Sequence, residues 1–133
     1  MKYYSLLFTL LFISLSFGQN DQKISTVETV EVLNNNKAEA IYYFKNNWKV
    51  LRDNAIKKGY IHSYSLMETT YGEETPFHII LITTYSNKEQ YEKREIHFKE
   101  LIDSHGSLRL LNDKKPGEFR KSRFSADPAK HIK

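Results

Sequence analysis

The chain has 133 residues, a formal net charge of +4 and no cysteine. Its length suits a single domain, because domains commonly have about 100 to 150 residues. The lack of cysteine excludes disulfides, thiolate metal sites and cysteine nucleophiles. Stability must therefore come from an apolar core, and a chain of this size gains stability by pairing with a second copy.

The first residues have the pattern of a secretory signal. A basic residue precedes an apolar run over residues 6–13, and small residues follow it. This order is typical of a signal peptide over residues 1–18 that is cleaved before Gln19. We expect a periplasmic or secreted protein without stable membrane insertion after cleavage, since the apolar run is shorter than the roughly 20 residues of a membrane span. A retained amino-terminal anchor is the alternative interpretation.

Basic residues gather near the end of the chain, over residues 109–123. In an exported protein such a cluster is typical of a solvated or anion-facing edge rather than of a nucleic-acid surface. We therefore expect no nucleic-acid partner.

One domain is expected over residues 26–125, and it begins with a β-branched strand from Thr26 to Leu33. A helix follows, with Asn36 as its N-cap and Glu39 placed to complete a capping box. It should end at Gly59, in the left-handed conformation that glycine adopts easily. The apolar stripe of this helix consists of Ile41, Phe44, Trp48, Leu51 and Ala55.

A hairpin comes next, with strands over Tyr60–Tyr71 and Phe77–Tyr85 and a turn between them. The second strand is apolar on both faces, which predicts that something covers each side of the sheet. A second helix is expected between Asn87, as its N-cap, and Gly106.

The last part of the chain is less regular. Residues 107–117 favour a pinned loop or a single helical turn, and Phe119–Phe124 predicts a last short strand. A flexible tail is expected over residues 126–133.

The order strand, helix, strand, strand, helix, strand predicts an α+β fold of the ferredoxin-like βαββαβ type. In that arrangement a four-stranded antiparallel sheet carries two helices on one face. The other face is left bare, and the sheet of a second subunit would cover it. We therefore expect a homodimer.

Four stretches carry a resemblance to a known superfamily. They are Asn46–Arg52, Lys58–Tyr60, Pro76–Leu81 and Asp113–Pro116, and the chain resembles small exported proteins with dimeric α+β barrels. That superfamily includes stress-responsive barrel domains, NIPSNAP-like proteins and antibiotic-biosynthesis monooxygenases. The resemblance implies a barrel closed by two sheets. Some members are cofactor-free monooxygenases or degrade haem with an Asn, Trp and His arrangement, but Trp48 lies in the helix stripe, so no catalytic residue is carried over.

His62 and His78 are the histidines of the hairpin. With the turn centred near residues 73 and 74, His62 lies opposite Tyr85 and His78 lies opposite Thr69, too far apart to share a metal ion. We therefore expect no metal site. His62 is a weak candidate for a general acid or base, although a histidine hydrogen-bonded within a barrel wall is the commoner case.

A hollow barrel would be lined by aromatic and imidazole side chains of the hairpin strands. The candidates for this ligand pocket are Tyr60, His62, Tyr64, His78 and Tyr85. A filled dimer core is the commoner setting for such tyrosines.

Three further side chains have binding chemistry. Arg52 and Arg94 can bind a carboxylate, although helix arginines more often pair with a nearby glutamate. Trp48 can stack on a ligand, but its helical spacing favours the core. No phosphate loop, nucleophile elbow, zinc motif or calcium loop is found, so we expect no cofactor.

Three functions remain open. The first is an exported dimeric barrel that binds a small apolar or aromatic molecule. The second is a cofactor-independent enzyme of the monooxygenase or isomerase kind that acts inside the barrel. The third is a structural or partner-binding protein of the cell envelope.

Overall fold

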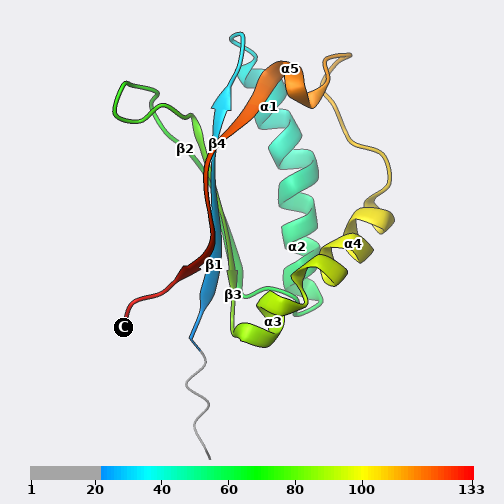
Figure 1. The fold of residues 1–133 in the computed structure, drawn as a ribbon. Helices are drawn as coiled ribbons and strands as arrows, with labels where there is room; N and C mark the ends of the chain where they lie inside the picture. The colour runs from blue at the N-terminus through cyan, green and yellow to red at the C-terminus, as the bar shows by residue number, and fades with distance from the viewer. Residues whose placement is uncertain (1–21) are drawn as a thin grey trace, which may run out of the picture.

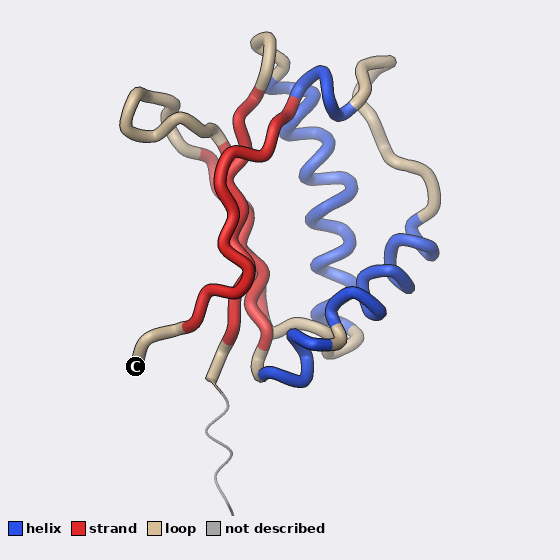
Figure 2. The backbone as a smooth tube through the Cα atoms, in the orientation of Figure 1, coloured by secondary structure: helices blue, strands red, loops and turns tan. Residues whose placement is uncertain are grey.

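The computed structural model describes residues 22–133, so the predicted signal peptide and its cleavage site lie outside the described residues. The chain forms an α+β fold with a four-stranded antiparallel sheet and helices along one side of it (Figures 1 and 2). This arrangement is compatible with the expected ferredoxin-like fold. Within residues 22–133, none of the helices combines the length and the apolar character needed to cross a bilayer.

The sheet consists of β1 (Ile24–Val32), β2 (Ser63–Glu68), β3 (Ile79–Tyr85) and β4 (Arg120–Lys130). Its spatial order is β2-β3-β1-β4, and every neighbouring pair is antiparallel. The first strand of the chain therefore lies inside the sheet, between the third and the fourth.

The register of the hairpin is the one predicted. Ser63 pairs with Thr84 and Glu68 pairs with Ile79, so the turn is centred between residues 73 and 74. Beyond the last pair, the Thr69 N–H donates to the His78 carbonyl at 2.8 Å. A slip of one residue would turn every side chain of the strand to the opposite face, so this register fixes which residues meet the helices.

The expected first helix is continuous but not uniform. It consists of α1 (Lys37–Tyr43), a π-helical segment η1 (Phe44–Trp48) and α2 (Lys49–Lys57). In the π segment, the side-chain amides of Asn46 and Asn47 each donate to the backbone carbonyl four residues earlier, at 2.8 and 2.9 Å. They satisfy carbonyls whose usual backbone bonds the wider turn disrupts.

The start of this helix differs from the prediction. Asn36 makes no side-chain capping bond; its amide donates to the Glu118 carbonyl at 3.1 Å and its side-chain oxygen accepts from Lys114 at 2.6 Å. Glu39 accepts from Lys114 and from Asn112 instead of completing a capping box. The predicted box was wrong because long-range partners from the end of the chain compete for both side chains.

The end of this helix confirms the prediction at Gly59, whose φ is +71°. The Gly59 N–H donates to the Ile56 carbonyl, and the Tyr60 N–H donates to the Ala55 carbonyl at 2.8 Å. This pair of bonds is the Schellman motif, which requires a left-handed residue in its centre.

The second expected helix has two segments, α3 (Lys88–Glu92) and α4 (Arg94–His105). Asn87 caps α3 as predicted, because its side-chain oxygen accepts the Gln90 N–H at 2.9 Å. The Gln90 side chain donates to the Gly59 carbonyl at 2.8 Å, so the end of α2 and the start of α3 are tied together.

The final strand is longer than predicted. A short helix α5 (Pro116–Phe119) comes first, and β4 then pairs with β1 as far as Lys130, opposite Ile24. The expected tail over residues 126–133 therefore begins within a strand. Its polar and small residues suggested a loose end, but the backbone hydrogen bonds of an edge strand do not require apolar side chains.

Two clusters of buried apolar side chains fill the space between sheet and helices. The upper core, near α5, consists of Val30, Val32, Ala40, Phe44, Ile79, Leu81 and Phe119. The lower core, near α3, consists of Ala55, Ile61, Tyr85 and Leu101.

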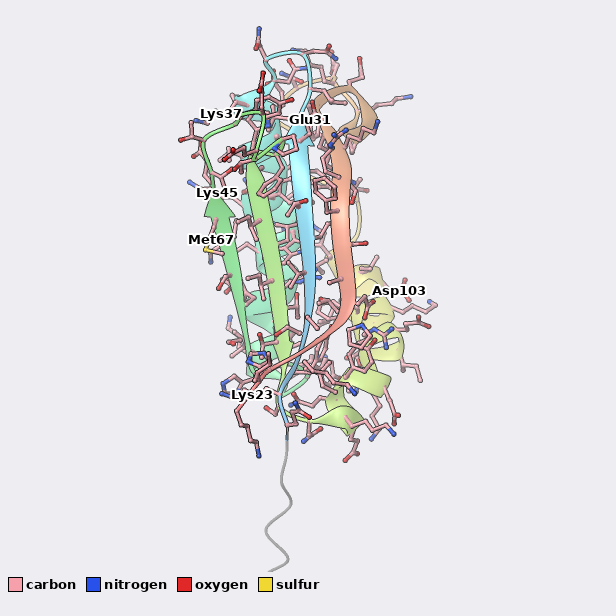
Figure 3. All side chains as sticks on the ribbon, turned by 60° about the vertical axis from the view of Figure 1, so that its left-hand side comes forward. Lys23, Glu31, Lys37, Lys45, Met67 and Asp103 are labelled. Carbon is pink, nitrogen blue, oxygen red and sulfur yellow. The ribbon has the colours of Figure 1, made fainter. Side chains whose placement is uncertain are left out.

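Within residues 22–133, no helix lies over the opposite face of the sheet (Figure 3). One row across this open face runs from Met67 through Ile80 and Thr29 to Phe124. Met67 is 43% exposed and Phe124 is 54% exposed. Apolar residues thus lie on both faces of the sheet, as predicted for β3, but in the described chain only one face is covered.

Candidate functional site

A cavity of about 370 Å³ opens between the sheet and the helices. Leu81, Thr83 and Tyr85 line it from β3, Trp48 lines it from η1, and Phe98 lines it from α4. Arg52, on α2, also lines it, so we call it the Arg52 cavity. It combines aromatic walls with a few polar groups, which is the usual composition of a small-molecule site.

The guanidinium of Arg52 lies between two aromatic rings. Its central carbon is 4.3 Å from the centre of the Trp48 ring and 4.4 Å from that of Phe98. Its Nε donates to the Thr83 hydroxyl at 3.2 Å. These contacts fix the position of the cation, since cation–π attraction and a side-chain hydrogen bond act on it together.

Among residues 22–133, no carboxylate forms an ion pair with Arg52. Burial lowers the pKa of Arg52 to about 10, while the nearby Tyr85 and Glu28 act in the opposite direction. The side chain therefore stays protonated at neutral pH. The lowered pKa reflects a cation that has lost water without gaining an anion.

Arg94 lines the same cavity but has partners of its own. It donates to the Tyr91 carbonyl at 3.0 Å, and its guanidinium carbon lies 4.0 Å from the centre of the Tyr91 ring. Its second terminal nitrogen is 3.7 Å from Asp127, which also accepts from the Tyr91 hydroxyl at 2.6 Å. Arg94 thus has an acidic partner, Asp127 rather than the nearby glutamate that was expected, whereas Arg52 has none in the described chain.

Of the predicted pocket residues, Tyr85 lines the Arg52 cavity and Tyr64 lies beside it. The Tyr64 ring meets the Trp48 ring edge-on at 5.6 Å, and its hydroxyl donates to Asp53. Burial and the bond to Asp53 raise the pKa of Tyr64. Tyr85 is 3% exposed, and burial raises its pKa against the effect of the two arginines.

Tyr60 lies outside the Arg52 cavity, between the end of α2 and α4. Its hydroxyl donates to Glu100 at 2.7 Å, and its ring stacks on His97 at 3.7 Å. The bond to Glu100 raises the pKa of Tyr60. His105, at the end of α4, bonds to the side-chain oxygen of Asn47 at 2.9 Å.

The two hairpin histidines lie at opposite ends of the hairpin. His62 is exposed and does not line the Arg52 cavity. The His78 ring nitrogen Nδ1 accepts the Val32 N–H at 2.9 Å, and the ring stacks on Tyr71 at 4.8 Å. The five predicted pocket residues therefore do not converge on one cavity.

Asn47 has a role that the sequence did not indicate. It is 3% exposed, and besides its bond within the helix its amide donates to the Arg109 carbonyl at 2.8 Å. Its oxygen accepts the Arg109 N–H at 2.9 Å and contacts His105. Asn47 thus holds the segment after α4 against the π turn. The pair of asparagines beside the apolar stripe of the helix is the signal for this role.

Comparison with protein-family models, curated proteins and solved structures found no match to this chain. Function therefore has to be inferred from the side chains that line its surfaces and cavities.

Proposed function

We propose that this protein is an exported homodimer, built as a dimeric α+β barrel, whose subunits each bind a small aromatic or apolar molecule in the Arg52 cavity. The observation that carries the binding proposal is the set of Trp48, Phe98 and Tyr85 around a volume of about 370 Å³. Pockets that bind small molecules commonly have volumes of about 300 to 1,000 Å³ and apolar or aromatic walls.

The polar groups of the cavity support a binding role over a purely structural one. Thr83 is 1% exposed and points toward the helices, where an aliphatic side chain would fill space better. Arg52 lines the same space without an acidic partner in the described chain. Polar groups that converge on an apolar cavity orient a ligand, whereas a core built for stability alone avoids them.

The chain's single tryptophan, Trp48, makes the binding proposal directly testable. We would titrate the protein with phenylacetamide, a neutral aromatic probe, and with phenylacetate, and follow Trp48 emission. Chemical-shift changes would show whether Phe98 and Tyr85 respond as well. We expect saturable binding of at least one probe at these three residues. Binding of neither probe, or shifts confined to other surfaces, would contradict the proposal.

The open face of the sheet supports the dimer. Besides the row through Met67 and Phe124, a second row runs from Ser65 through Ile82 and Val27 to Ala126. Its centre is aliphatic, and large exposed apolar patches of this kind commonly mark an interface. The β2–β3 turn and the C-terminal end both project on this side (Figure 1), so they flank the face that a second copy would cover.

Light scattering after size exclusion would test the dimer. We expect twice the subunit mass for the natural chain and one subunit mass for Ile82→Glu, which places a charge in the centre of the open face. The matched control is Ile96→Glu on α4, where the side chain is already 74% exposed. A monomeric natural chain, or an unchanged dimer in Ile82→Glu, would exclude this interface.

Export would be tested on the full-length chain in a bacterial host. We expect a processed protein in the periplasm or medium whose first residue is Gln19, identified by mass spectrometry of the N-terminal peptide. A full-length protein that stays in the cytoplasm would contradict export.

A further inference from the structure

We propose that the ligand of the Arg52 cavity is an organic anion, namely a small aromatic or apolar molecule with a carboxylate that binds the terminal nitrogens of Arg52. This inference rests on the proposed function and names the chemical class of its ligand.

The first support is that Arg52 has hydrogen-bond donors to spare. A guanidinium has five N–H donors, and in the described residues only Nε has an acceptor, the Thr83 hydroxyl. The two terminal nitrogens have none among residues 22–133. Arg52 is partly exposed and lines the cavity, so these donors are accessible to an acceptor that arrives with a ligand.

The second support is the geometry around the cation. The rings of Trp48 and Phe98 contact the guanidinium, with centres 4.3 and 4.4 Å from its central carbon. The rings therefore occupy two sides of the guanidinium, and an acceptor must approach from a side that they leave open. A carboxylate fits this approach because it is flat and accepts two parallel N–H bonds.

The third support is the position of the apolar surface. The same rings that hold Arg52, together with Leu81 and Tyr85, line the cavity. A carboxylate at Arg52 would therefore place the apolar part of the same molecule against aromatic walls. Inorganic phosphate or sulfate would leave those walls unused, so an aromatic carboxylate is the better match.

Acidic side chains also line the cavity and oppose an anion. Asp127 is engaged by Tyr91 and Arg94, and Glu95 is exposed. Glu28 lies close enough to influence the pKa of Arg52 but forms no ion pair in the described chain. We expect Glu28 to weaken anion binding, so its removal should strengthen it.

The experiment compares phenylacetate with phenylacetamide on the natural protein at neutral pH. The two molecules have nearly the same shape, but only phenylacetate is charged. We expect phenylacetate to bind at least about tenfold more tightly, because a hydrogen bond to a charged group contributes more than a neutral one. This comparison requires no variant, so a folding defect cannot obscure it.

Three variants identify the side chain that causes the preference for the anionic probe. Arg52→Gln should remove the preference for the anion while Trp48 still reports binding of phenylacetamide. Glu28→Gln should increase the affinity for phenylacetate a few-fold and leave the affinity for phenylacetamide unchanged. Arg94→Gln is the matched control, because Arg94 lines the same cavity but already has partners, and it should change the preference by less than about threefold.

The outcomes separate the inference from the proposed function. Equal affinity for the two probes, or a preference for phenylacetate that persists in Arg52→Gln, would contradict the proposal that Arg52 binds an anion. The proposed aromatic binding site would not be affected. Binding of neither probe would overturn both. A preference lost in Arg94→Gln and kept in Arg52→Gln would also overturn the inference, since it would assign the anion to the other arginine.

Discussion

In the upper core, Phe44, Ile79 and Phe119 are each at most 2% exposed, whereas two turns further along the same helix Arg52 points into a cavity of about 370 Å³. Both regions lie between the same sheet and the same long helix, and α4 adds a further wall to the cavity. On β3 the residues facing the helices change from Ile79 and Leu81 to Thr83 within a few positions.

The comparison shows that two tasks, stabilising the fold and leaving space for a ligand, are divided along the sheet. Large aliphatic and aromatic side chains at the upper end bury apolar surface and stabilise the fold at about 25 cal/mol per Å². Toward the lower end, β3 presents the Thr83 hydroxyl and α2 presents the Arg52 guanidinium beside open space, next to the smaller lower core. The composition of residues facing inward therefore separates the part that holds the fold from the part that can hold a ligand.

The largest effect should follow from breaking the upper core. Phe44→Ala should lower the free energy of unfolding by about 4 kcal/mol, because it removes a buried aromatic ring and leaves a cavity. Denaturant unfolding measures this change. Ile56→Ala on the same helix, where the side chain is 43% exposed, should cost less than about 1 kcal/mol. Similar losses in the two variants would mean that the upper core does not dominate stability.

The next effect tests the junction between the two regions, where Asn47 binds Arg109. Asn47→Ala should cost about 3 kcal/mol, since it leaves buried backbone groups without partners. Hydrogen exchange gives a specific reading, because the Arg109 amide should lose its protection. Asn46→Ala, which removes a single bond within the helix, is the control and should leave that amide protected. An Arg109 amide that stays protected in Asn47→Ala would show that another group holds the segment.

A smaller effect is expected at the lower end of the helix. Gly59→Ala should cost about 1 kcal/mol, because Gly59 has a φ of +71° that alanine adopts with strain. Gly117→Ala is a close control: neither position has an atom within 4 Å of an added methyl group, and Gly117 has no positive φ. Thermal unfolding should therefore separate the two variants, and equal melting temperatures would rule out backbone strain as the cause.

The smallest effect on stability should come from Arg52. In Arg52→Met, the lost contacts with Trp48 and Phe98 are offset by the removal of a partly buried charge, so the free energy of unfolding should change by less than about 1 kcal/mol. Denaturant unfolding without ligand is the measurement. A loss as large as that of Phe44→Ala would show that Arg52 belongs to the supporting core, and the contrast between the two regions would disappear.

The sequence predicted the elements with local signals well. The hairpin register and the Gly59 helix end agree with the structure, because strand alternation and left-handed glycine are determined within a few residues. The predicted capping box at Asn36 was wrong, because Asn36 and Glu39 bond instead to residues 112–118, which lie far away in the sequence.

The site was harder to predict for the same reason. Arg52 was recognised as a possible carboxylate ligand, but its lack of an acidic partner depends on where α4 and β1 come to lie. Glu28 faces the helices only because of the pairing of β1 with β3, in which it lies opposite Leu81. His62 and His78 attracted attention by residue type alone, and the register separates them.

The π segment determines how the site responds to a change in the number of residues in the helix. Five residues, Phe44–Trp48, form a turn that is wider than an α-helical one, so the helix contains about one residue more than its height requires. Deleting Lys45, which is exposed, would let the turn close as an α-helix while its two flanks keep their relative orientation, because the wide turn absorbs the extra residue. In a helix of uniform α geometry, the same deletion would instead rotate Arg52 by about 100° and take it out of the cavity. The π turn is therefore a place where this helix can gain or lose one residue and still keep Arg52 in the cavity.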